Sequence, residues 1–409
     1  MDHRVKPGGD EVKKVPRIAI IGGGLAGLAS AAALSHFGVA ADVFEAALSL
    51  GEIGAGVNVS PQAIRVLRAI GLGDSIAAVA NTSAGVLTRD MHSGAALYYR
   101  DHADVEERFG APRCSFHRAD LLDALSRGVD RRLLYLGHRL IAIEEKAANV
   151  ELRFANGAAH EAELVIAADG IHSVVRRALY GDDNPSYTGQ MVWRALLPGA
   201  SVSADVLEPS GHIQWLGSGR HFFAYYLRRC EVVNLVTQQD TEQWVEEGWS
   251  IPGDVDEMRA SFPDPEPRLA ALLGAVTRCS QWGLFMRPLT GNWGRGRIQL
   301  IGDAAHAMLP NAGQGAAQAF EDAYILARWL AAMPGDPAAA MDNFRRIRIP
   351  RAHAVQRVSS AIVRTKHDYD PRGQDTARAQ VDAIDAMAWI WGYDVVDAWD
   401  KLPAVPEAV

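Results

Sequence analysis

A stretch without charged residues near the N-terminus constrains the fold more than any other feature of the sequence. From Ile18 to Ala41 the chain has no Lys, Arg, Asp or Glu, and a stretch of this length could span a bilayer as a helix. It contains five glycines, however, and half of its apolar residues are alanine. Because the stretch is weakly hydrophobic and interrupted by glycines, we predict a strand, a turn and a helix and no membrane span.

The residues around these glycines have the order of a βαβ unit. The apolar run 17–21 predicts a buried parallel strand. Residues 25–37 predict a helix that ends at Gly38, and 41–45 predict a second strand.

The turn between the first strand and the helix has the spacing G-x-G-x-x-G of a dinucleotide-binding fingerprint. In this fingerprint Gly22 allows the tight turn, Gly24 lets the backbone approach a pyrophosphate, and Gly27 allows close packing of helix on strand. Leu25 and Ala26 begin the helix, whose free N–H groups bind the phosphate. We therefore assign all five residues to cofactor binding.

Glu45 ends the second predicted strand, 18 residues beyond the last glycine of the fingerprint. A carboxylate at this distance accepts hydrogen bonds from the ribose hydroxyls of the cofactor. The fingerprint and the acid fit NAD and FAD equally well, so other segments have to decide between these cofactors.

Two later segments place an aspartate at the end of a predicted buried strand. Asp169 follows the strand 164–168, and Gly302 with Asp303 follows the strand 297–301. We assign these three residues to cofactor binding as well.

The segment after Asp303 favours FAD. A glycine-rich turn leads from this residue directly into a long helix predicted over 314–332. We expect Asp303 to bind a ribityl hydroxyl of the cofactor. We expect the helix N-terminus, near Gly315 and Ala316, to face the N1–C2=O edge of the flavin, where the positive end of the helix dipole stabilises the anionic reduced ring. An NAD-binding protein would leave this segment unexplained.

The pattern changes between the two glycine motifs. From 187 to 236, aromatic and β-branched residues alternate with polar ones, which predicts an antiparallel sheet with one face on a core. We therefore predict an α/β (α+β) fold: a Rossmann-like FAD-binding domain, an interleaved antiparallel β-sheet substrate domain and a helical C-terminal segment. The expected ranges are a disordered extension at 1–15, the FAD-binding domain at 16–185 plus 280–335, the substrate domain at 186–279 and the helical segment at 336–409.

Composition excludes several classes of protein. With 409 residues, 48% hydrophobic and 22% charged, the chain has the size and balance of two globular domains. Its net charge of −8 argues against binding to nucleic acid. The three cysteines are far apart, without a C-x-x-C pair, and residues 1–15 lack the apolar core of a signal peptide. We expect a cytoplasmic protein without a metal site.

Three further motifs accompany the nucleotide-binding segments: G-E-I-G-A-G-V at 51–57, H-R-A-D-L at 117–121 and W-I-W-G-Y-D at 389–394. The three nucleotide-binding segments, in their order along the chain, resemble the single-component flavoprotein aromatic hydroxylases of the salicylate hydroxylase type, and the resemblance covers nearly the whole chain, including these further motifs. The last motif, and Tyr225 with its neighbour, are also similar to 6-hydroxynicotinate 3-monooxygenases. Asn58 stands where those enzymes carry a histidine, which weakens that assignment.

The resemblance implies an FAD-dependent monooxygenase that uses NADH or NADPH and O2 and acts through a flavin C4a-hydroperoxide. Its substrate would be a hydroxylated aromatic carboxylate such as salicylate, with loss of CO2 when the attacked carbon carries the carboxyl group. A 6-hydroxynicotinate 3-monooxygenase and a 3-hydroxybenzoate hydroxylase are the alternatives within the family. An NAD-dependent dehydrogenase and a non-catalytic flavin redox sensor are the alternatives outside it. We expect a monomer or homodimer that binds neither nucleic acid nor a membrane.

The resemblance also implies roles for individual residues. Arg118 would reach the FAD pyrophosphate, and the Leu140 backbone would contact the adenosine side. Pro310 would lie beside the reactive edge of the flavin, where a proline offers a carbonyl but no N–H. Asn58 would face the substrate, and Arg89 would attract its carboxylate unless Arg89 is a plain surface arginine.

His221 is the candidate acid–base residue. His221, Phe223 and Tyr225 alternate along a predicted strand and so point to one face of the sheet. A histidine that titrates near neutrality can take the proton of a phenol, which makes the ring a better nucleophile. Tyr225 would help to orient the substrate. The alternative is a structural histidine.

Other charged residues predict structural roles. We expect Arg176 to hold the architecture through Asp169, and His306 to be structural. The remaining group is a basic run that predicts a single solvated helix face: Arg345, Arg346, Arg348 and Arg351.

Overall fold

The computed structural model of the protein describes residues 16–51, 55–242, 246, 251–369 and 387–406. Three predicted features lie wholly or partly outside these ranges: the extension at 1–15, the middle of the motif at 51–57 and the central part of the predicted helical tail, 370–386.

A six-stranded sheet forms the nucleotide-binding half of the molecule. Its strand order is β19-β20-β12-β1-β2-β8, parallel except for the antiparallel edge strand β19. All four residues of both β1 and β12 are buried, as expected for central parallel strands with both faces covered. The bounds are β1 Ile18–Ile21, β2 Ala41–Phe44, β8 Leu134–Tyr135, β12 Leu164–Ala167, β19 Gly294–Arg295 and β20 Ile298–Leu300.

The alanine-rich part of the charge-free stretch is a buried helix, α1 (Leu25–His36). Its residues from Gly27 to Leu34 are all buried. It packs against α5 (Arg118–Ser126) and α10 (Gly315–Ala332), and its small side chains let the helices approach closely. The prediction of strand, turn and helix is confirmed.

An eight-stranded sheet forms the second half, in the order β17-β18-β13-β16-β15-β14-β5-β6. All neighbours are antiparallel except β14 and β5, which run parallel. The bounds are β5 Gly85–Asp90, β6 Ala96–Asp101, β13 Ser186–Pro198, β14 His212–Gly217, β15 Arg220–Leu227, β16 Val232–Asp240, β17 Ile251–Gly253 and β18 Cys279–Met286.

The sheets do not follow the predicted division of the chain. Strands β5 and β6 fall within the range 16–185, which we assigned to the FAD-binding domain, yet they pair into the eight-stranded sheet. The range 85–101 therefore belongs structurally with the eight-stranded sheet. β5 pairs with the edge of β14, which lies more than a hundred residues later in the chain. No local sequence pattern predicts a pairing between strands so far apart.

Two three-stranded sheets and shorter helices complete the described structure. The sheets have the orders β11-β10-β9 and β3-β7-β4. Their bounds are β3 Gly56–Val59, β4 Asn81–Thr82, β7 Cys114–His117, β9 Leu140–Glu145, β10 Val150–Phe154 and β11 Ala159–Ala162. The helices are α2 Pro61–Ala69, α3 Gly73–Ala77, α4 Val105–Phe109, α6 Val174–Tyr180, α7 Val255–Ala260, α8 Pro267–Ala275 and α9 Asp303–His306.

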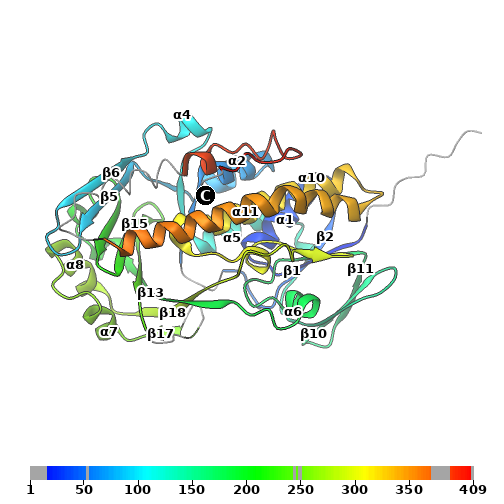
Figure 1. Ribbon diagram of the computed structural model, residues 1–409, viewed down its shortest axis with the longest axis horizontal. Helices are drawn as coiled ribbons and strands as arrows, with labels where there is room; N and C mark the ends of the chain where they lie inside the picture. Colours follow the sequence, from blue (N-terminus) through cyan, green and yellow to red (C-terminus); the bar gives the residue numbers. More distant parts are fainter. Residues whose placement is uncertain (1–15, 52–54, 243–245, 247–250, 370–386, 407–409) are drawn as a thin grey trace, which may run out of the picture.

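The long helix α11 (Pro337–His367) connects the two halves. In Figure 1 it runs, in orange, across the molecule from α10 to the end of the eight-stranded sheet. It contacts α10 near its start and β14 and β15 toward its end. Its last turns therefore reach the substrate sheet from the nucleotide-binding side.

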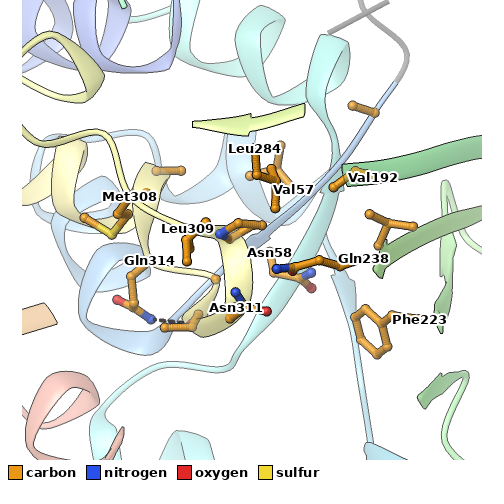
Figure 2. Close-up of a pocket in the computed structure, with 18 of the residues that line it drawn as sticks. Val57, Asn58, Val192, Phe223, Gln238, Leu284, Met308, Leu309, Asn311 and Gln314 are labelled. Atoms are coloured by element: carbon orange, nitrogen blue, oxygen red, sulfur yellow. Dashed lines mark hydrogen bonds between the residues drawn. The ribbon is translucent and has the colours of Figure 1, made fainter. Parts of the chain in front are cut away.

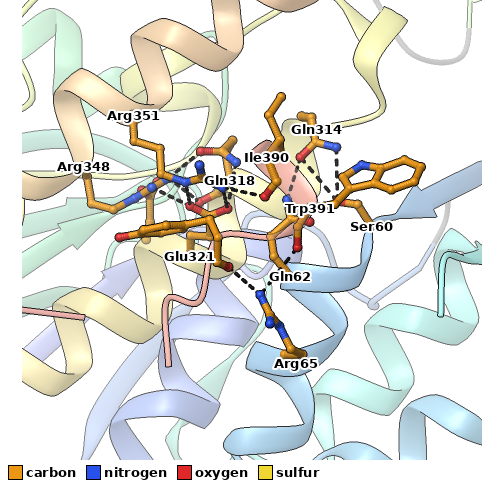
Figure 3. A network of polar contacts seen from close by, with 12 residues as sticks. Ser60, Gln62, Arg65, Gln314, Gln318, Glu321, Arg348, Arg351, Ile390 and Trp391 are labelled. Carbon is orange, nitrogen blue, oxygen red and sulfur yellow. Dashed lines mark hydrogen bonds and ion pairs between the residues drawn. The ribbon is translucent and has the colours of Figure 1, made fainter. Parts of the chain in front are cut away.

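The predicted solvated basic face on α11 is wrong for two of its four arginines. Arg348 and Arg351 are fully buried and form ion pairs with Glu321, and Arg348 also pairs with Asp322 (Figure 3). The carboxylates come from α10, so these pairs hold α11 onto α10. Only Arg346 is exposed, and sequence alone could not reveal the acids of the facing helix.

Among the residues that the structure describes, no helix is both long and apolar enough to cross a lipid bilayer.

Candidate active site

A cavity of about 550 Å³ lies between the glycine turn of the nucleotide-binding half and the eight-stranded sheet. Figure 2 shows its middle part, where Leu309 and Asn311 from the loop before α10 face Val192, Phe223 and Gln238 from the sheet. Residues from both halves thus line one continuous space.

The glycine turn has the shape that a pyrophosphate requires. A Cβ atom at Gly27 would lie 1.8 Å from the Gly22 carbonyl oxygen, so only glycine allows this packing. Gly22 has φ +105°, a conformation that side chains disfavour. A Cβ at Gly24 would meet nothing within 4 Å, and Gly24, Leu25 and Ala26 line the cavity. The turn therefore leaves open space at the N-terminus of α1, as FAD requires.

Charged residues surround this space. The Glu45 carboxylate accepts hydrogen bonds from the backbone N–H of Gly23 at 2.6 Å and of Ala47 at 2.7 Å, which fixes it beside the turn. Arg118 begins α5 and lines the cavity. Burial lowers the pKa of Arg118, while the charges of Asp303 and Glu45 raise it, so this arginine lies between the two acids.

Asp303 and the start of α10 line the cavity together. Burial raises the pKa of Asp303, against the lowering effect of His306, Arg118 and Arg287. Gln314, Gly315 and Ala316 form the N-terminal end of the 18-residue helix α10, and all three face the same space. Pro310 lines it as well. These residues suit the flavin end of FAD, because a helix N-terminus and a buried acid supply opposite charges at short range.

Six residues assigned to cofactor binding do not line the cavity: Gly22, Gly27 and Glu45 lie at or beside the glycine turn, and Leu140, Asp169 and Gly302 lie elsewhere. Leu140 begins β9 and lies in the hydrophobic core, and Gly302 donates its backbone N–H to Asp322 at 3.0 Å. Asp169 accepts a hydrogen bond from Ser173 Oγ at 2.6 Å and another from the Val175 N–H at 3.2 Å, and so caps α6.

The prediction that Arg176 acts through Asp169 is wrong. The Arg176 guanidinium pairs with Asp183 and donates to the carbonyl oxygens of Asn292 at 3.0 Å and Ala304 at 3.2 Å. It is buried and ties α6 to the segments before β19 and within α9. His306 is buried with its Nε2 2.6 Å from an Asp322 oxygen, as a structural histidine would be.

Strand β15 presents the predicted face to the cavity. His221, Phe223 and Tyr225 all line it, whereas Phe222 and Ala224, which alternate with them, are buried in the core on the other side of the sheet. Burial raises the pKa of Tyr225 to about 12, although Arg194, Arg113 and a hydrogen bond with Asn58 work to lower it. Tyr225 is therefore a protonated hydrogen-bonding group at neutral pH, and not a base.

Arg89 does not reach the cavity. On β5, Val86 and Thr88 line the cavity, so Arg89 points to the opposite face, where its Nη1 donates to the Gly94 carbonyl oxygen at 2.6 Å. The expectation that it attracts the substrate carboxylate is wrong, because the strand period turns it away.

Besides Arg118 and Arg194, three cations line the cavity: Arg100 of β6, Arg113 before β7 and Lys366 near the end of α11, here called the cation cluster. Burial lowers the pKa of Lys366 to about 7, and the charges of Arg100 and Arg113 add to this effect. Burial and Arg113 likewise lower the pKa of Arg100 to about 10. Among the lining residues, Asp303 is the one acid, and it pairs electrostatically with Arg118.

The described residues contain no group of three or more His, Cys, Asp and Glu side chains arranged to hold a metal ion. The geometry is that of a site for an organic cofactor and an anionic ligand.

Comparison with known proteins agrees with this geometry. The family profile described as "FAD binding domain" matches residues 16–359. A 3-amino-4-hydroxybenzoate 2-monooxygenase of Streptomyces platensis is 36% identical over 93% of this chain and 96% of its own length. The chain belongs to the FAD-dependent aromatic hydroxylases. This membership decides for a monooxygenase and against a dehydrogenase or a redox sensor.

Other relatives of this hydroxylase support the same family. A 6-hydroxynicotinate 3-monooxygenase of Bordetella bronchiseptica is 34% identical over 93% of this chain and 96% of its own length. The solved salicylate hydroxylase substrate complex has a TM-score of 0.81 and 28% identity, and covers 97% of this chain and 100% of that one. The predicted fold class is thereby confirmed.

The cation cluster of the hydroxylase was not predicted from its sequence. Arg100 and Tyr98 alternate along β6, and both line the cavity, so the alternation A-L-Y-Y-R-D carried a usable signal. Lys366 and Arg113 have no comparable signal, because their convergence depends on how α11 and β7 pack.

Proposed function

We propose that this hydroxylase hydroxylates a small aromatic ring that carries both a carboxylate and a hydroxyl group, with NADH or NADPH as reductant. The observation that carries the proposal is the cation cluster. The three cations are half-buried, no acid lies beside them among the described lining residues, and their like charges disfavour one another; a bound carboxylate would relieve that repulsion. The names of four kinds of relatives contain a ring with both groups: 3-amino-4-hydroxybenzoate, 6-hydroxynicotinate, 3-hydroxybenzoate and salicylate.

Different residues along the cavity bind the substrate carboxylate and the ring hydroxyl. The cation cluster binds the substrate carboxylate and so fixes one end of the ring. His221 and Tyr225, on the cavity face of β15, meet the ring hydroxyl: the imidazole takes its proton, and the Tyr225 hydroxyl donates a hydrogen bond to the resulting oxyanion.

Apolar side chains form the remaining walls and exclude water from the ring. They come from the sheet, the loop before α10 and the C-terminal segment: Val192, Phe223, Trp282, Leu284, Met308, Leu309, Met387 and Trp391. A dry site strengthens the interactions of the cations and of the tyrosine with the substrate.

FAD fits the glycine turn, Glu45, Arg118, Asp303 and the N-terminus of α10, and when bound it supplies the redox chemistry that links the nicotinamide, dioxygen and the ring. Because Leu140, Asp169 and Gly302 lie outside the cavity lining, we expect their influence on FAD to be indirect.

The test is a substrate panel on the purified yellow protein. NADH and NADPH oxidation, hydroxylated product and released CO2 are measured with salicylate, 3- and 4-hydroxybenzoate, 3-amino-4-hydroxybenzoate and 6-hydroxynicotinate. Each acid is paired with its carboxamide as the matched neutral ligand. We expect at least one acid to stimulate coupled turnover and its amide to bind at least tenfold more weakly. Equal binding of acid and amide would contradict carboxylate recognition.

A further inference from the structure

Two cross-strand residue pairs lie against each other at the wall of the cavity. Tyr225 of β15 is paired with His212 of β14, and Asn58 of β3 is paired with Ser115 of β7. The His212 and Tyr225 rings are stacked, with centroids 5.3 Å apart and an angle of 8° between their planes. Of these four residues, only Tyr225 and Asn58 were predicted as site residues.

A chain of hydrogen bonds joins the two pairs. Ser115 Oγ lies 2.7 Å from Asn58 Oδ1 and 2.9 Å from His212 Nε2. The single hydroxyl hydrogen of Ser115 is donated to the Asn58 oxygen, so Nε2 of His212 carries the hydrogen that Ser115 Oγ accepts. Ser115 is 1% exposed and His212 2% exposed, so bulk water does not compete for these bonds.

This series of hydrogen bonds ends at the Tyr225 hydroxyl. Because Ser115 holds the oxygen of the Asn58 amide, the amide nitrogen is left to bond Tyr225, and this bond works to lower the pKa of the phenol. An amide nitrogen only donates, so the Tyr225 oxygen accepts and keeps its own hydrogen for another partner. A Cβ at Gly56 would lie 2.2 Å from the Tyr225 hydroxyl, so glycine there leaves the hydroxyl its place.

We propose that Ser115 and His212 are positioning residues which, through Asn58, orient the Tyr225 hydroxyl so that it donates into the cavity to the reacting hydroxyl of the substrate. This arrangement stabilises the phenolate form of the ring. The inference rests on the proposed function, since it assumes a substrate that carries a hydroxyl group.

The groups around His212 and Tyr225 keep the donor and acceptor roles in this series of hydrogen bonds fixed. Burial lowers the pKa of His212 well below its ordinary value, with further lowering by the charges of Arg113 and His102. His212 therefore stays neutral at physiological pH. The charged groups near Tyr225 are Arg194 and Arg113, both cations that favour an oxyanion beside it.

The test uses 4-hydroxy-3-nitrobenzoate, a hydroxylated aromatic carboxylate whose phenolate absorbs visible light. Titration of the FAD-loaded protein with bound probe gives the pKa of the probe's hydroxyl in the wild type and in variants. We expect Ser115→Ala to raise this pKa by about one unit, or about 1.4 kcal/mol. Ser115→Thr, which keeps a hydroxyl, should restore most of the wild-type value.

Ser210→Ala is the matched control. Ser210 is also a buried serine and donates its hydroxyl to the His212 carbonyl oxygen at 2.7 Å, but it does not contact the ring at Nε2. We expect this variant to leave the probe's pKa unchanged. His212→Gln serves as the second variant should Ser115→Ala lose its FAD or its folded thermal transition.

A double-mutant cycle separates positioning from a general structural effect. In a Tyr225→Phe background, Ser115→Ala should have no further effect on the probe's pKa, because the chain acts only through the tyrosine hydroxyl. An unchanged pKa in Ser115→Ala with the probe bound, or a shift that persists without the hydroxyl, overturns the inference alone. A wild type that fails to bind the probe at all overturns the proposed function and this inference together.

Discussion

The Lys366 ammonium group lies near enough to the Arg100 guanidinium group, in one buried cavity, for the arginine's charge to lower the pKa of the lysine. Lys366 comes from the end of α11 and Arg100 from β6, so the folded chain holds two like charges together. Such an arrangement costs stability unless an anion joins it. This is the structural basis of the first two predictions.

Arg100→Gln should weaken substrate binding while leaving FAD content intact. Loss of one buried charge-assisted hydrogen bond costs about 1.5–3 kcal/mol, which corresponds to a roughly 10- to 100-fold higher Kd. Arg89→Gln is the matched control, since Arg89 lies one strand away on the opposite face. Ligand titration by flavin fluorescence measures both. A larger effect in Arg89→Gln would restore our original assignment of the carboxylate site.

Lys366 should make binding of the substrate carboxylate depend on pH. Its pKa in the substrate-free protein is about 7, so the ammonium is increasingly lost above pH 7. Because a bound carboxylate favours the charged lysine, Kd should rise above pH 7, by up to about tenfold per pH unit. His102, with a pKa of about 3, and Arg100, with about 10, titrate outside this window.

Lys366→Met is the control for that pH dependence. The slope of log Kd against pH from 6.5 to 8.5 should flatten in the variant, and the difference between the two slopes isolates the lysine from His221. The effect of Lys366 on fold stability has the opposite pH dependence to its effect on substrate binding. Because the folded-state pKa is lowered, the unfolded chain binds the extra proton between pH 7 and about 10.4, so this lysine makes the free energy of unfolding rise with pH there.

His221→Asn should slow hydroxylation by about 10²–10⁴-fold at neutral pH, with FAD content unchanged. The loss should shrink as pH rises toward the phenolic pKa of the substrate, because solvent then supplies the phenolate. Hydrogen peroxide should replace hydroxylated product per NADH consumed. His160→Asn, outside the cavity lining, is the matched control. Wild-type rate and coupling in His221→Asn would make His221 a structural histidine.

Asp303→Ala should give largely colourless protein. The buried carboxylate faces the cavity beside Arg118, where it can bind a ribityl hydroxyl, and its loss should raise the FAD Kd by about 10- to 100-fold. Absorbance at 450 nm relative to 280 nm after purification measures the retained cofactor. Asp42→Ala, on β2 beside His160, is expected to stay yellow. Full flavin content in Asp303→Ala would argue against the assigned contact.

Glu321→Ala should destabilise the fold by about 3–5 kcal/mol, because Arg348 and Arg351 would become buried charges without their shared partner. A more exposed pair on α11 provides the control: Asp342, 73% exposed, pairs with Arg345, 17% exposed, and Asp342→Ala should cost less than about 1 kcal/mol. Urea unfolding followed by circular dichroism compares them. Similar costs for both variants would mean that the buried network contributes no more than a surface pair.

The sequence by itself determined the parts of the protein that depend on short-range backbone geometry. Gly22 requires a positive φ and Gly27 a close helix contact, and each requirement excludes other residues locally, while Gly24 leaves open space for the cofactor. The alternation along β15 likewise fixed which face carries His221, Phe223 and Tyr225. Such patterns act within one strand or turn, so they could be interpreted before any tertiary contact was known.

Only the tertiary structure decided where charges converge. The pairing of β5 with β14 and β6 places Arg100 at the cavity, and the packing of α11 on α10 buries Arg348 against acids 26 and 27 residues away. A charged side chain has the same helical or strand periodicity whether it meets water, a counter-ion or a substrate. The partner of such a side chain comes from another helix or strand. The packing of elements that are distant in sequence therefore determines which partner it meets.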